Sequence, residues 1–478
     1  MDPLFGDATI QEKARRDEQS RLDIIIVGGG LGGLGAAIAI LLAGHDVTVL
    51  EAASDIGEIG AGIQILPNAA RILFSWGLKD ILEPHATLPR KCNFWGWKGN
   101  HLSEMDFHKY AHVTKAPFWD FHRANLLDGL LTRAVQLGAK VITNARVQDF
   151  TIGTKKSKES SATVFLSDGR TMTADLVIGA DGIHSKLRGI FLGKEDPPIP
   201  TGDLAYRLLL STECMMTDPE LRDFVDNPQV NYWLGPSVHA VNYILRGGDL
   251  LNMVLLVPDD MPAGKTYTVE GGVREMRDHL EQWDPRLGRL AALCDSQSIL
   301  KWRLCIRPAL EPKWSDSSGA FTMLGDAVHA TLPYLASGAG MALEDGGVLG
   351  LCLSRLTDKS PCSKRKALEV YEACRRERTE KVVQRGSHNQ QVYHLPDGPE
   401  QAQRDVKFKI FQELDKEWLS EETPMLPNVQ ETGDDPFPWR YHGVARWLLT
   451  YDMWRDVDEK WAACSAPEFM REPLGHGA

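Results

Sequence analysis

The chain has 478 residues, of which 43% are hydrophobic and 25% charged, and its formal net charge is -12 at pH 7. This length is enough for roughly two or three domains with a large apolar core. The acidic balance, without a concentrated basic face, argues against nucleic-acid binding. The eight cysteines are scattered without a CxxC pair, which is typical of reduced thiols and predicts neither a disulfide framework nor a zinc site.

The first twenty residues are polar and lack the apolar stretch of a secretory signal. We expect a disordered tail over residues 1–20. No uninterrupted apolar run is long enough to cross a bilayer, so the sequence predicts no membrane span. Together with the cysteine pattern, these features favour a cytoplasmic location.

A nucleotide-binding pattern follows the tail. Residues 22–27 form a run that is apolar except at Asp23, as in a parallel strand buried on both faces. Gly28, Gly30 and Gly33 then supply G-x-G-x-x-G at the start of an Ala- and Leu-rich helix, whose free N–H groups favour a pyrophosphate. A second strand ends at Glu51, which can accept hydrogen bonds from ribose hydroxyls and would repel a 2′-phosphate. The pattern predicts a site for FAD or NAD rather than NADP.

The chain does not continue with the alternating strands and helices of a simple NAD dehydrogenase. A helix is predicted from Arg123, and a strand over residues 175–178 runs into Gly-Ala-Asp181-Gly. A later strand ends in Gly-Asp326 before another helix. Asp326 and His329, three residues apart, suggest metal or acid–base chemistry, but no third ligand lies nearby. We therefore expect no metal site and a structural role for His329.

Three segments together resemble a known family. The glycine motif, "DLVIGADGIHSKLR" and "LGDAVHATLPYLASGAGMALEDG" are similar to the fingerprints of the single-component (group A) FAD-dependent aromatic monooxygenases, in that family's order and over residues 21–360. "AYRLLL", "VNYILRGGDLLN" and "RWLLTYD" resemble the salicylate-hydroxylase-like branch. The resemblance implies the p-hydroxybenzoate hydroxylase fold. This is an α/β (α+β overall) protein with a Rossmann-like FAD-binding domain, an inserted antiparallel-sheet substrate domain and a helical C-terminal region.

The resemblance also implies a division of the chain. The discontinuous FAD-binding domain takes residues 21–89, 108–195 and 300–363. The substrate domain takes residues 90–107 and 196–299, and the helical C-terminal region takes residues 364–478.

Cofactor contacts are implied position by position. Arg123 corresponds to an arginine that reaches the flavin phosphate and ribityl region, the Val147 backbone to an adenine contact, and Asp326 to a ribityl acceptor. Asp181 is associated with both FAD and NAD(P)H. The segment Gly338–Met341 would pass the pyrimidine edge of the flavin, where a helix N-terminus favours negative charge. The full predicted FAD set is Gly28, Gly30, Gly33, Glu51, Arg123, Val147, Asp181, Asp326, Gly338, Ala339, Gly340 and Met341.

Substrate-side candidates lie on predicted strands. The resemblance implies that Arg207 corresponds to the family's substrate-anchoring or phenolate-stabilising cation. The alternative is a structural ion pair. His239 and Tyr243 alternate along one strand and share a face, so both are expected to line the pocket, with simple packing as the alternative. Tyr232 and Glu58 are weaker candidates.

The implied reaction uses FAD, with NADPH or NADH as transient electron donor. A flavin C4a-hydroperoxide formed with O2 would hydroxylate a small, electron-rich, phenolic or salicylate-like aromatic substrate, and Pro333 is expected near the flavin face. Two alternatives stay open. One is the same flavin chemistry used in secondary metabolism for oxidative dearomatisation, epoxidation or indole oxidation with spirocyclisation, and the other is a flavin dehydrogenase or reductase without oxygen insertion. The substrate, the donor and the choice between monomer and homodimer are not determined by the sequence.

Overall fold

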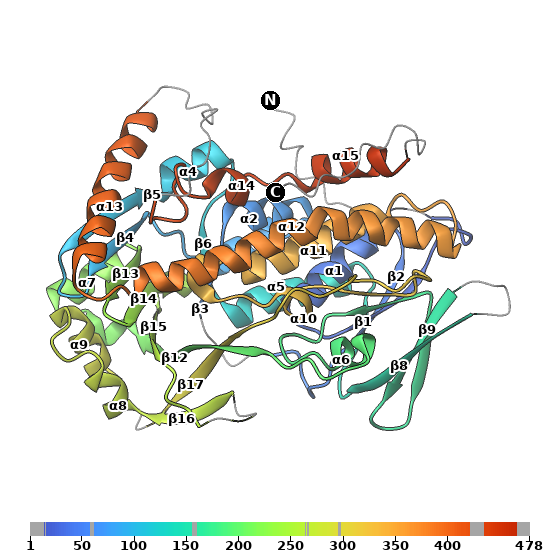
Figure 1. Cartoon of the computed structure of the whole chain (residues 1–478), viewed down its shortest axis with the longest axis horizontal. Coiled ribbons are helices and arrows are strands. Elements are labelled where there is room, and N and C mark those ends of the chain that lie inside the picture. Colours follow the sequence, from blue (N-terminus) through green and yellow to red (C-terminus); the bar gives the residue numbers. More distant parts are fainter. Residues whose placement is uncertain are drawn as a thin grey trace.

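The computed structural model describes residues 14, 16–57, 62–154, 160–262, 264, 267–294, 298–420 and 435–465. The predicted tail over residues 1–20 lies mostly outside these ranges. Figure 1 shows two large sheets toward opposite ends of the molecule, with the long helix α12 (Pro361–Tyr393) extending along its length. Within the described ranges, every helix is too short or too polar to cross a bilayer.

The first sheet is parallel and five-stranded. Its strands, in spatial order, are β18 (Phe321–Met323), β11 (Leu176–Gly179), β1 (Asp23–Val27), β2 (Asp46–Leu50) and β7 (Lys140–Ile142). The central strands are almost entirely apolar and buried, because α1 (Leu31–Leu42) contacts β1 and β2 while β9 (Ser160–Leu166) and β10 (Thr171–Ala174) of a smaller sheet contact β11 and β1. Helix α11 (Gly338–Leu353) packs closely on α1, since a Cβ on Gly346 would lie 2.7 Å from the Ala36 nitrogen. Glycine on α11 therefore sets the approach of these two helices.

Two smaller sheets accompany the parallel one. The first contains β8 (Val147–Thr154), β9 (Ser160–Leu166) and β10 (Thr171–Ala174), and the second pairs β3 (Gly62–Ile65) with β6 (Trp119–His122). The helices of the half that contains the parallel sheet are α2 (Pro67–Ser75), α3 (Lys79–Leu82), α5 (Arg123–Gln136), α6 (Lys186–Leu192) and α10 (Asp326–His329). Helix α4 (Phe107–Thr114) follows β5, and its buried residues Phe107 and Tyr110 pack in the core beside the eight-stranded sheet.

The second large sheet has eight strands. Their order is β16 (Thr268–Gly272), β17 (Ser298–Ile306), β12 (Ile199–Ser211), β15 (Leu250–Pro258), β14 (Val238–Leu245), β13 (Val230–Gly235), β4 (Lys91–Gly96) and β5 (His101–Asp106). The neighbours are antiparallel except β13 and β4, which run parallel and bring the 90–107 segment to this sheet. The predicted boundary at residue 299 falls inside β17, which stays in the sheet to Ile306.

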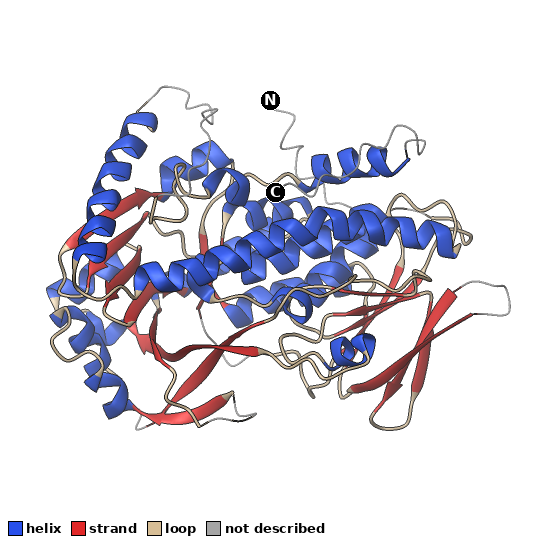
Figure 2. Cartoon of the chain, in the orientation of Figure 1, coloured by secondary structure: helices blue, strands red, loops and turns tan. Residues whose placement is uncertain are grey.

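The eight-stranded sheet has two differently covered faces. Helices α7 (Pro219–Asp226), α8 (Val273–Asp278) and α9 (Pro285–Ala292) pack on the outer face. The inner face packs on the segment around Tyr334 and Met341 and on the C-terminal part of the chain. Figure 2 shows this part as mainly helical: it contains α12, α13 (Pro399–Trp418), α14 (Ala445–Leu449) and α15 (Met453–Ser465). The predicted fold class is therefore confirmed.

Candidate functional site

The turn between β1 and α1 requires glycine at two of its three motif positions, for two different reasons. Gly28 has φ +116°, and a Cβ there would lie 2.2 Å from the Ala180 oxygen. A Cβ on Gly33 would lie 2.0 Å from the Gly28 oxygen, so only glycine lets the helix pack here. Gly30, the residue before α1, has no heavy atom within 4 Å of its Cβ position. The space beside the helix start is open.

Glu51 supports this turn from the end of β2. Its Oε2 atom accepts a hydrogen bond from the Gly29 nitrogen at 2.8 Å, and Oε1 accepts from the Ala53 nitrogen at 2.8 Å. The sequence predicted a ribose acceptor, and the structure adds a backbone role. Each carboxylate oxygen has a further lone pair, so both roles are compatible.

Asp181 lies beside the glycine turn and caps a helix. Its carboxylate accepts from Ser185 Oγ at 2.6 Å and from the Lys186 and Leu187 nitrogens at 2.8 and 3.1 Å, at the start of α6. Burial raises the pKa of Asp181, and these hydrogen bonds oppose the rise. Sequence reasoning predicted a cofactor contact and missed this capping role.

The Gly325–Asp326 turn follows β18 and leads into α10. Gly325 has φ +62° and ψ −146°, and Asp326 is exposed at the first position of α10. His329 points elsewhere: it is buried, and its Nε2 atom lies 2.6 Å from Asp345 Oδ2. Over the described residues, no cluster of three His, Cys, Asp or Glu side chains could hold a metal ion.

The ends of these strands meet at one edge of the parallel sheet. Val27 pairs with Gly179, and Gly179 pairs with Met323, so β1, β11 and β18 end in register. The turns that follow carry Gly28, Asp181 and Asp326. In open parallel sheets, ligands bind at the carboxyl ends of the strands, and this edge is therefore the candidate site.

Helix α11 begins beside the same edge. A Cβ on Gly32 would lie 3.1 Å from Leu324 and from Ala342, so the α1 start, the end of β18 and α11 are in contact. Gly338 and Ala339 are half-buried at the α11 start, while Gly340 and Met341 are buried. The first turn holds no acidic residue and has no side-chain cap, and its Met341 nitrogen donates to the Ser337 oxygen. The N–H groups at the helix start therefore favour a negative charge.

The remaining predicted cofactor residues lie on neighbouring elements. Arg123 is half-buried and begins α5 directly after β6. Val147, 8% exposed, begins β8. Pro333 is exposed and begins a 3-10 turn that ends at Leu335. Glu58 lies outside the described residues.

Arg207, His239 and Tyr243 occupy one face of the eight-stranded sheet. Register places Arg207 opposite Val254 and places Tyr243 opposite Asn252, and this is the inner face. The shared face predicted for His239 and Tyr243 is present. The Arg207 guanidinium lies over the Trp302 ring, 4.8 Å from its centroid. Trp302 was missed because its place beside Arg207 depends on the pairing of β12 with β17.

Tyr243 and Asn252 clamp β3 to this inner face. A Cβ on Gly62 would lie 2.6 Å from Tyr243 Oη and 2.7 Å from Asn252 Cγ. The Gly62 nitrogen donates to Asn252 Oδ1 at 3.0 Å. Burial raises the pKa of Tyr243, and nearby Asp120 adds to this effect. The parallel-sheet half and the eight-stranded sheet are therefore in direct contact beside the site.

His239 belongs to a buried polar cluster at the end of α12. It is 2% exposed, and its Nδ1 atom lies 2.7 Å from His394 Nε2. Burial, followed by the neighbouring His394, holds the pKa of His239 well below its usual value. His394 Nδ1 in turn lies 3.6 Å from Asp203. His239 is therefore neutral near pH 7, and sequence reasoning missed its two partners.

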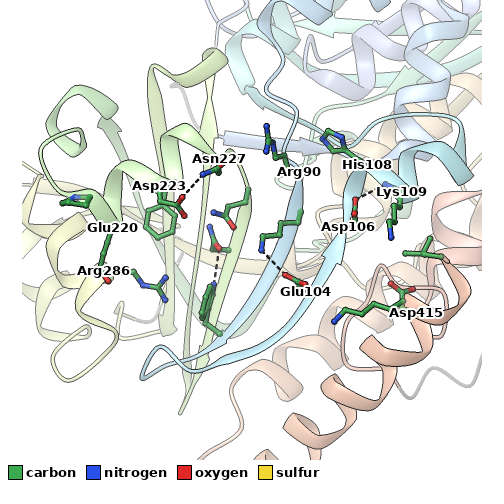
Figure 3. A pocket seen from close by; sticks show the side chains of 18 residues that line it. Arg90, Glu104, Asp106, His108, Lys109, Glu220, Asp223, Asn227, Arg286 and Asp415 are labelled. Carbon is green, nitrogen blue, oxygen red and sulfur yellow. Dashed lines mark hydrogen bonds and ion pairs between the residues drawn. The ribbon is translucent and has the colours of Figure 1, made fainter.

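A large open cavity lies elsewhere. It has a volume of about 1420 Å³ and opens near β4, β5, α7 and α13 (Figure 3). Its walls include Arg90, Glu104, Asp223, Arg286 and Asp415, so it is strongly charged. Trp95, Asn231 and Phe224 place it on the outer side of the eight-stranded sheet. We do not assign the site to it, because the three strand ends lie elsewhere.

Comparison with known proteins identifies the family of the chain. A family model described as an FAD binding domain matches residues 21–386. The FAD-dependent monooxygenase OpS4 of Beauveria bassiana is 39% identical over 424 residues, covering 88% of this chain and 94% of that protein. The 3-amino-4-hydroxybenzoate 2-monooxygenase of Streptomyces cremeus is 31% identical over 422 residues, covering 86% and 98%. A salicylate hydroxylase substrate complex aligns with a TM-score of 0.70 at 20% identity, over 95% of this chain and 100% of that one.

The family model covers most of the chain, and relatives above 30% identity cover more than four fifths of it. The predicted family is confirmed. The chain belongs to the FAD-binding-domain family and is a flavoprotein monooxygenase of the aromatic hydroxylase type.

Proposed function

We propose that FAD lies along the edge where β1, β11 and β18 end. The observation that carries this proposal is the in-register ending of these strands, which gathers Gly28, Asp181 and Asp326. The open space at Gly30 fits a pyrophosphate at the start of α1, with Glu51 at the adenosine ribose. Arg123 and Val147 complete the phosphate and adenine contacts, and Asp326 accepts from the ribityl chain.

The start of α11 would receive the pyrimidine edge of the cofactor. Small residues at Gly338–Gly340 permit close approach, and the N–H groups at the helix start favour negative charge there. When bound, FAD would supply an acceptor for the hydride of NADH or NADPH and, once reduced, the means of activating O2 for transfer of one oxygen atom to the substrate. The protein's part is to hold the ring, keep water out and orient the substrate.

The inner face of the eight-stranded sheet would form the other wall of the pocket. Arg207, backed by Trp302, binds a carboxylate or phenolate on the substrate. Tyr243 lies where this face meets β3. Neutral His239 lines the far end of the same strand, and exposed Pro333 faces the ring. We propose a small phenolic or benzoate-like aromatic as the substrate class, as in the names of the relatives.

Aerobic turnover tests this proposal. Purified protein loaded with FAD is mixed with NADH or NADPH and a panel of salicylates, resorcinols and indoles under 18O2, and product masses are recorded. The proposal expects one labelled oxygen in the product of a phenolic acid. A product oxidised without labelled oxygen would establish a dehydrogenase instead. An oxygenated product formed only from indoles would show that indoles, and not phenolic acids, are the substrate class.

A further inference from the structure

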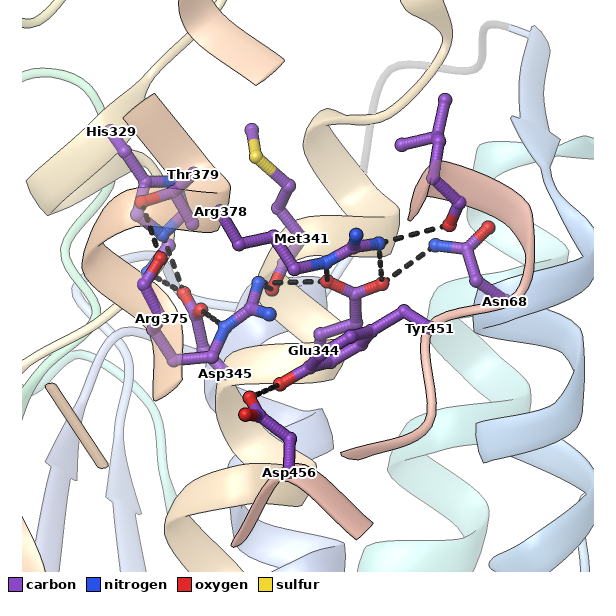
Figure 4. A network of polar contacts seen from close by, with 12 residues as sticks. Asn68, His329, Met341, Glu344, Asp345, Arg375, Arg378, Thr379, Tyr451 and Asp456 are labelled. Carbon is purple, nitrogen blue, oxygen red and sulfur yellow. Dashed lines mark hydrogen bonds and ion pairs between the residues drawn. The ribbon is translucent and has the colours of Figure 1, made fainter. Parts of the chain in front are cut away.

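A buried ionic network lies beneath the start of α11. Its central member, Asp345, is on α11 and is fully buried (Figure 4). Asp345 Oδ2 accepts from the Gly325 nitrogen at 2.8 Å and from His329 Nε2 at 2.6 Å. Asp345 Oδ1 accepts from Arg375 Nε at 2.7 Å. One carboxylate on α11 is thus bonded to the β18–α10 turn, to α10 and to α12.

The neighbouring charges balance. Arg375 Nη2 lies 2.8 Å from Glu344 Oε2 and donates to the Met341 carbonyl at 3.3 Å. Arg378 donates two further hydrogen bonds to Glu344, from Nε to Oε2 at 2.8 Å and from Nη2 to Oε1 at 2.7 Å. Burial alone would raise the pKa of Asp345, but His329 and Arg375 lower it to about 2. Two carboxylates and two guanidinium groups therefore neutralise one another inside the protein.

The network joins the two segments that face the proposed flavin. Gly325, whose nitrogen Asp345 holds, directly precedes Asp326, the proposed ribityl acceptor. Met341, whose carbonyl Arg375 holds, lies in the first turn of α11. These contacts fix the distance between the ribityl site and the pyrimidine site, although the segments belong to different elements.

We infer that Asp345 is a positioning residue for the cofactor: through Gly325, His329 and Arg375 it holds the Asp326 turn and the start of α11 in one geometry. This inference rests on the proposed placement of FAD. Asp345 touches no cofactor atom itself and acts through the backbone of both segments. Its charge also matters, because without it Arg375 would add positive charge close to the helix start.

A second buried Asp–Arg pair provides a matched control. Asp435 and Arg440 are both fully buried, with bonds of 2.8 and 2.9 Å. Asp435 also accepts from the Phe437 nitrogen at 2.9 Å. This pair resembles the Asp345–Arg375 pair in its burial and in its direct carboxylate–guanidinium contact, although Arg440 makes two hydrogen bonds to Asp435 and Arg375 makes one to Asp345. It contacts neither Gly325 nor the start of α11. Asp435→Asn should therefore show the cost of losing a buried charge without the positioning effect.

The test compares Asp345→Asn with Asp435→Asn. For each variant the FAD Kd, the visible spectrum and reduction potential of the bound flavin, and the Tm of the apoprotein are measured. Both variants should lower Tm. Asp345→Asn should also raise the FAD Kd about tenfold or more and make the potential of the bound flavin more positive, whereas Asp435→Asn should leave the Kd and potential unchanged.

A milder variant keeps the test decisive if Asp345→Asn does not fold. His329→Asn leaves the Asp345–Arg375 bond and should raise the FAD Kd about threefold or more, with an altered visible spectrum. The inference would be overturned if Asp345→Asn kept the wild-type FAD Kd, spectrum and potential. If only His329→Asn folds, the same result in that variant would overturn it. An equal loss of FAD affinity in Asp435→Asn would also overturn it. A wild-type protein that binds no FAD would instead overturn the proposed function.

Discussion

At the scale of single residues, Gly30 differs from its two companions in the glycine motif. Gly28 and Gly33 are required by the protein itself, because a Cβ at either position would collide with backbone. Gly30 meets nothing within 4 Å, so the folded protein alone does not require glycine there. The absent side chain therefore indicates a ligand that approaches the backbone at this point, as a pyrophosphate does.

Gly30→Ala should separate folding from cofactor binding. The apoprotein should keep its Tm within about 2 °C, because the new methyl group enters open space, while the FAD Kd should rise at least about tenfold because the methyl group displaces the pyrophosphate. Calorimetry and flavin fluorescence provide the two readings. Gly153→Ala, which also enters open space but on β8, should change neither reading. Wild-type FAD affinity in Gly30→Ala would remove the pyrophosphate from this turn.

Arg207 carries the substrate-side proposal. Replacing it with alanine removes a cation that lies over Trp302. Product formation per unit of enzyme should fall about ten- to a hundredfold, the loss of one charged hydrogen bond, while the FAD content of the purified protein stays constant. Arg222→Ala removes an exposed arginine paired with Asp226 and should have no effect on turnover. Loss of FAD from Arg207→Ala would show that Arg207 supports the cofactor instead.

The lowered pKa of His239 predicts a pH dependence. The unfolded chain, with the ordinary value of 6.5, takes up the proton first, so the contribution of this histidine to stability is complete above pH 6.5 and declines below it. The free energy of unfolding should therefore fall by about 1 kcal/mol less in His239→Gln than in wild type as the pH drops from 6.5 to 5.5. Chemical denaturation at each pH measures this difference, and exposed His108→Gln serves as control. The groups facing His239 are the buried Tyr232, Tyr334 and Tyr393 and the half-buried His394.

At the scale of elements, local patterns predicted the strand–turn–helix units correctly. Each fingerprint is a short apolar strand followed by glycine and a helix start, and these features are contiguous in sequence. Other contacts depend on pairing between distant segments. Trp302 reaches Arg207 only through β12–β17 pairing, and β4 joins the eight-stranded sheet through a parallel pairing with β13. His394 meets His239 because α12 extends 33 residues before it ends. No local sequence pattern predicts these long-range contacts.

Capping by Asp181 gives a prediction for α6. Asp181→Ala should lower the free energy of unfolding by about 1–2 kcal/mol, because the amides at the helix start lose their acceptor, and it should also weaken FAD binding because this turn packs on Gly28. Asp106→Ala removes the cap of α4, where Asp106 accepts from the Lys109 nitrogen at 3.0 Å. Both variants should have a lower free energy of unfolding than wild type, and only Asp181→Ala should bind FAD more weakly. Equal FAD affinity would reduce Asp181 to a structural cap.

At the scale of the whole molecule, the proposed cofactor site is assembled from distant parts of the chain. The turns after β1, β11 and β18 and the start of α11 meet at one edge. The contacts of Tyr243 and Asn252 with Gly62 hold the eight-stranded sheet against the half of the molecule that contains the parallel sheet. A ligand bound along this edge would hold all of these parts together, whereas a ligand in the charged cavity of Figure 3 would contact β4, β5, β13 and the helices near them.

Hydrogen exchange of the apoprotein before and after FAD addition tests this placement directly. Bound FAD should slow exchange together at Gly28–Leu34, Gly325–His329 and Gly338–Met341, and leave β4 and β5 unchanged. Slower exchange at β4, β5 and α7, with those three segments unaffected, would contradict the account and move the cofactor to the outer face of the eight-stranded sheet.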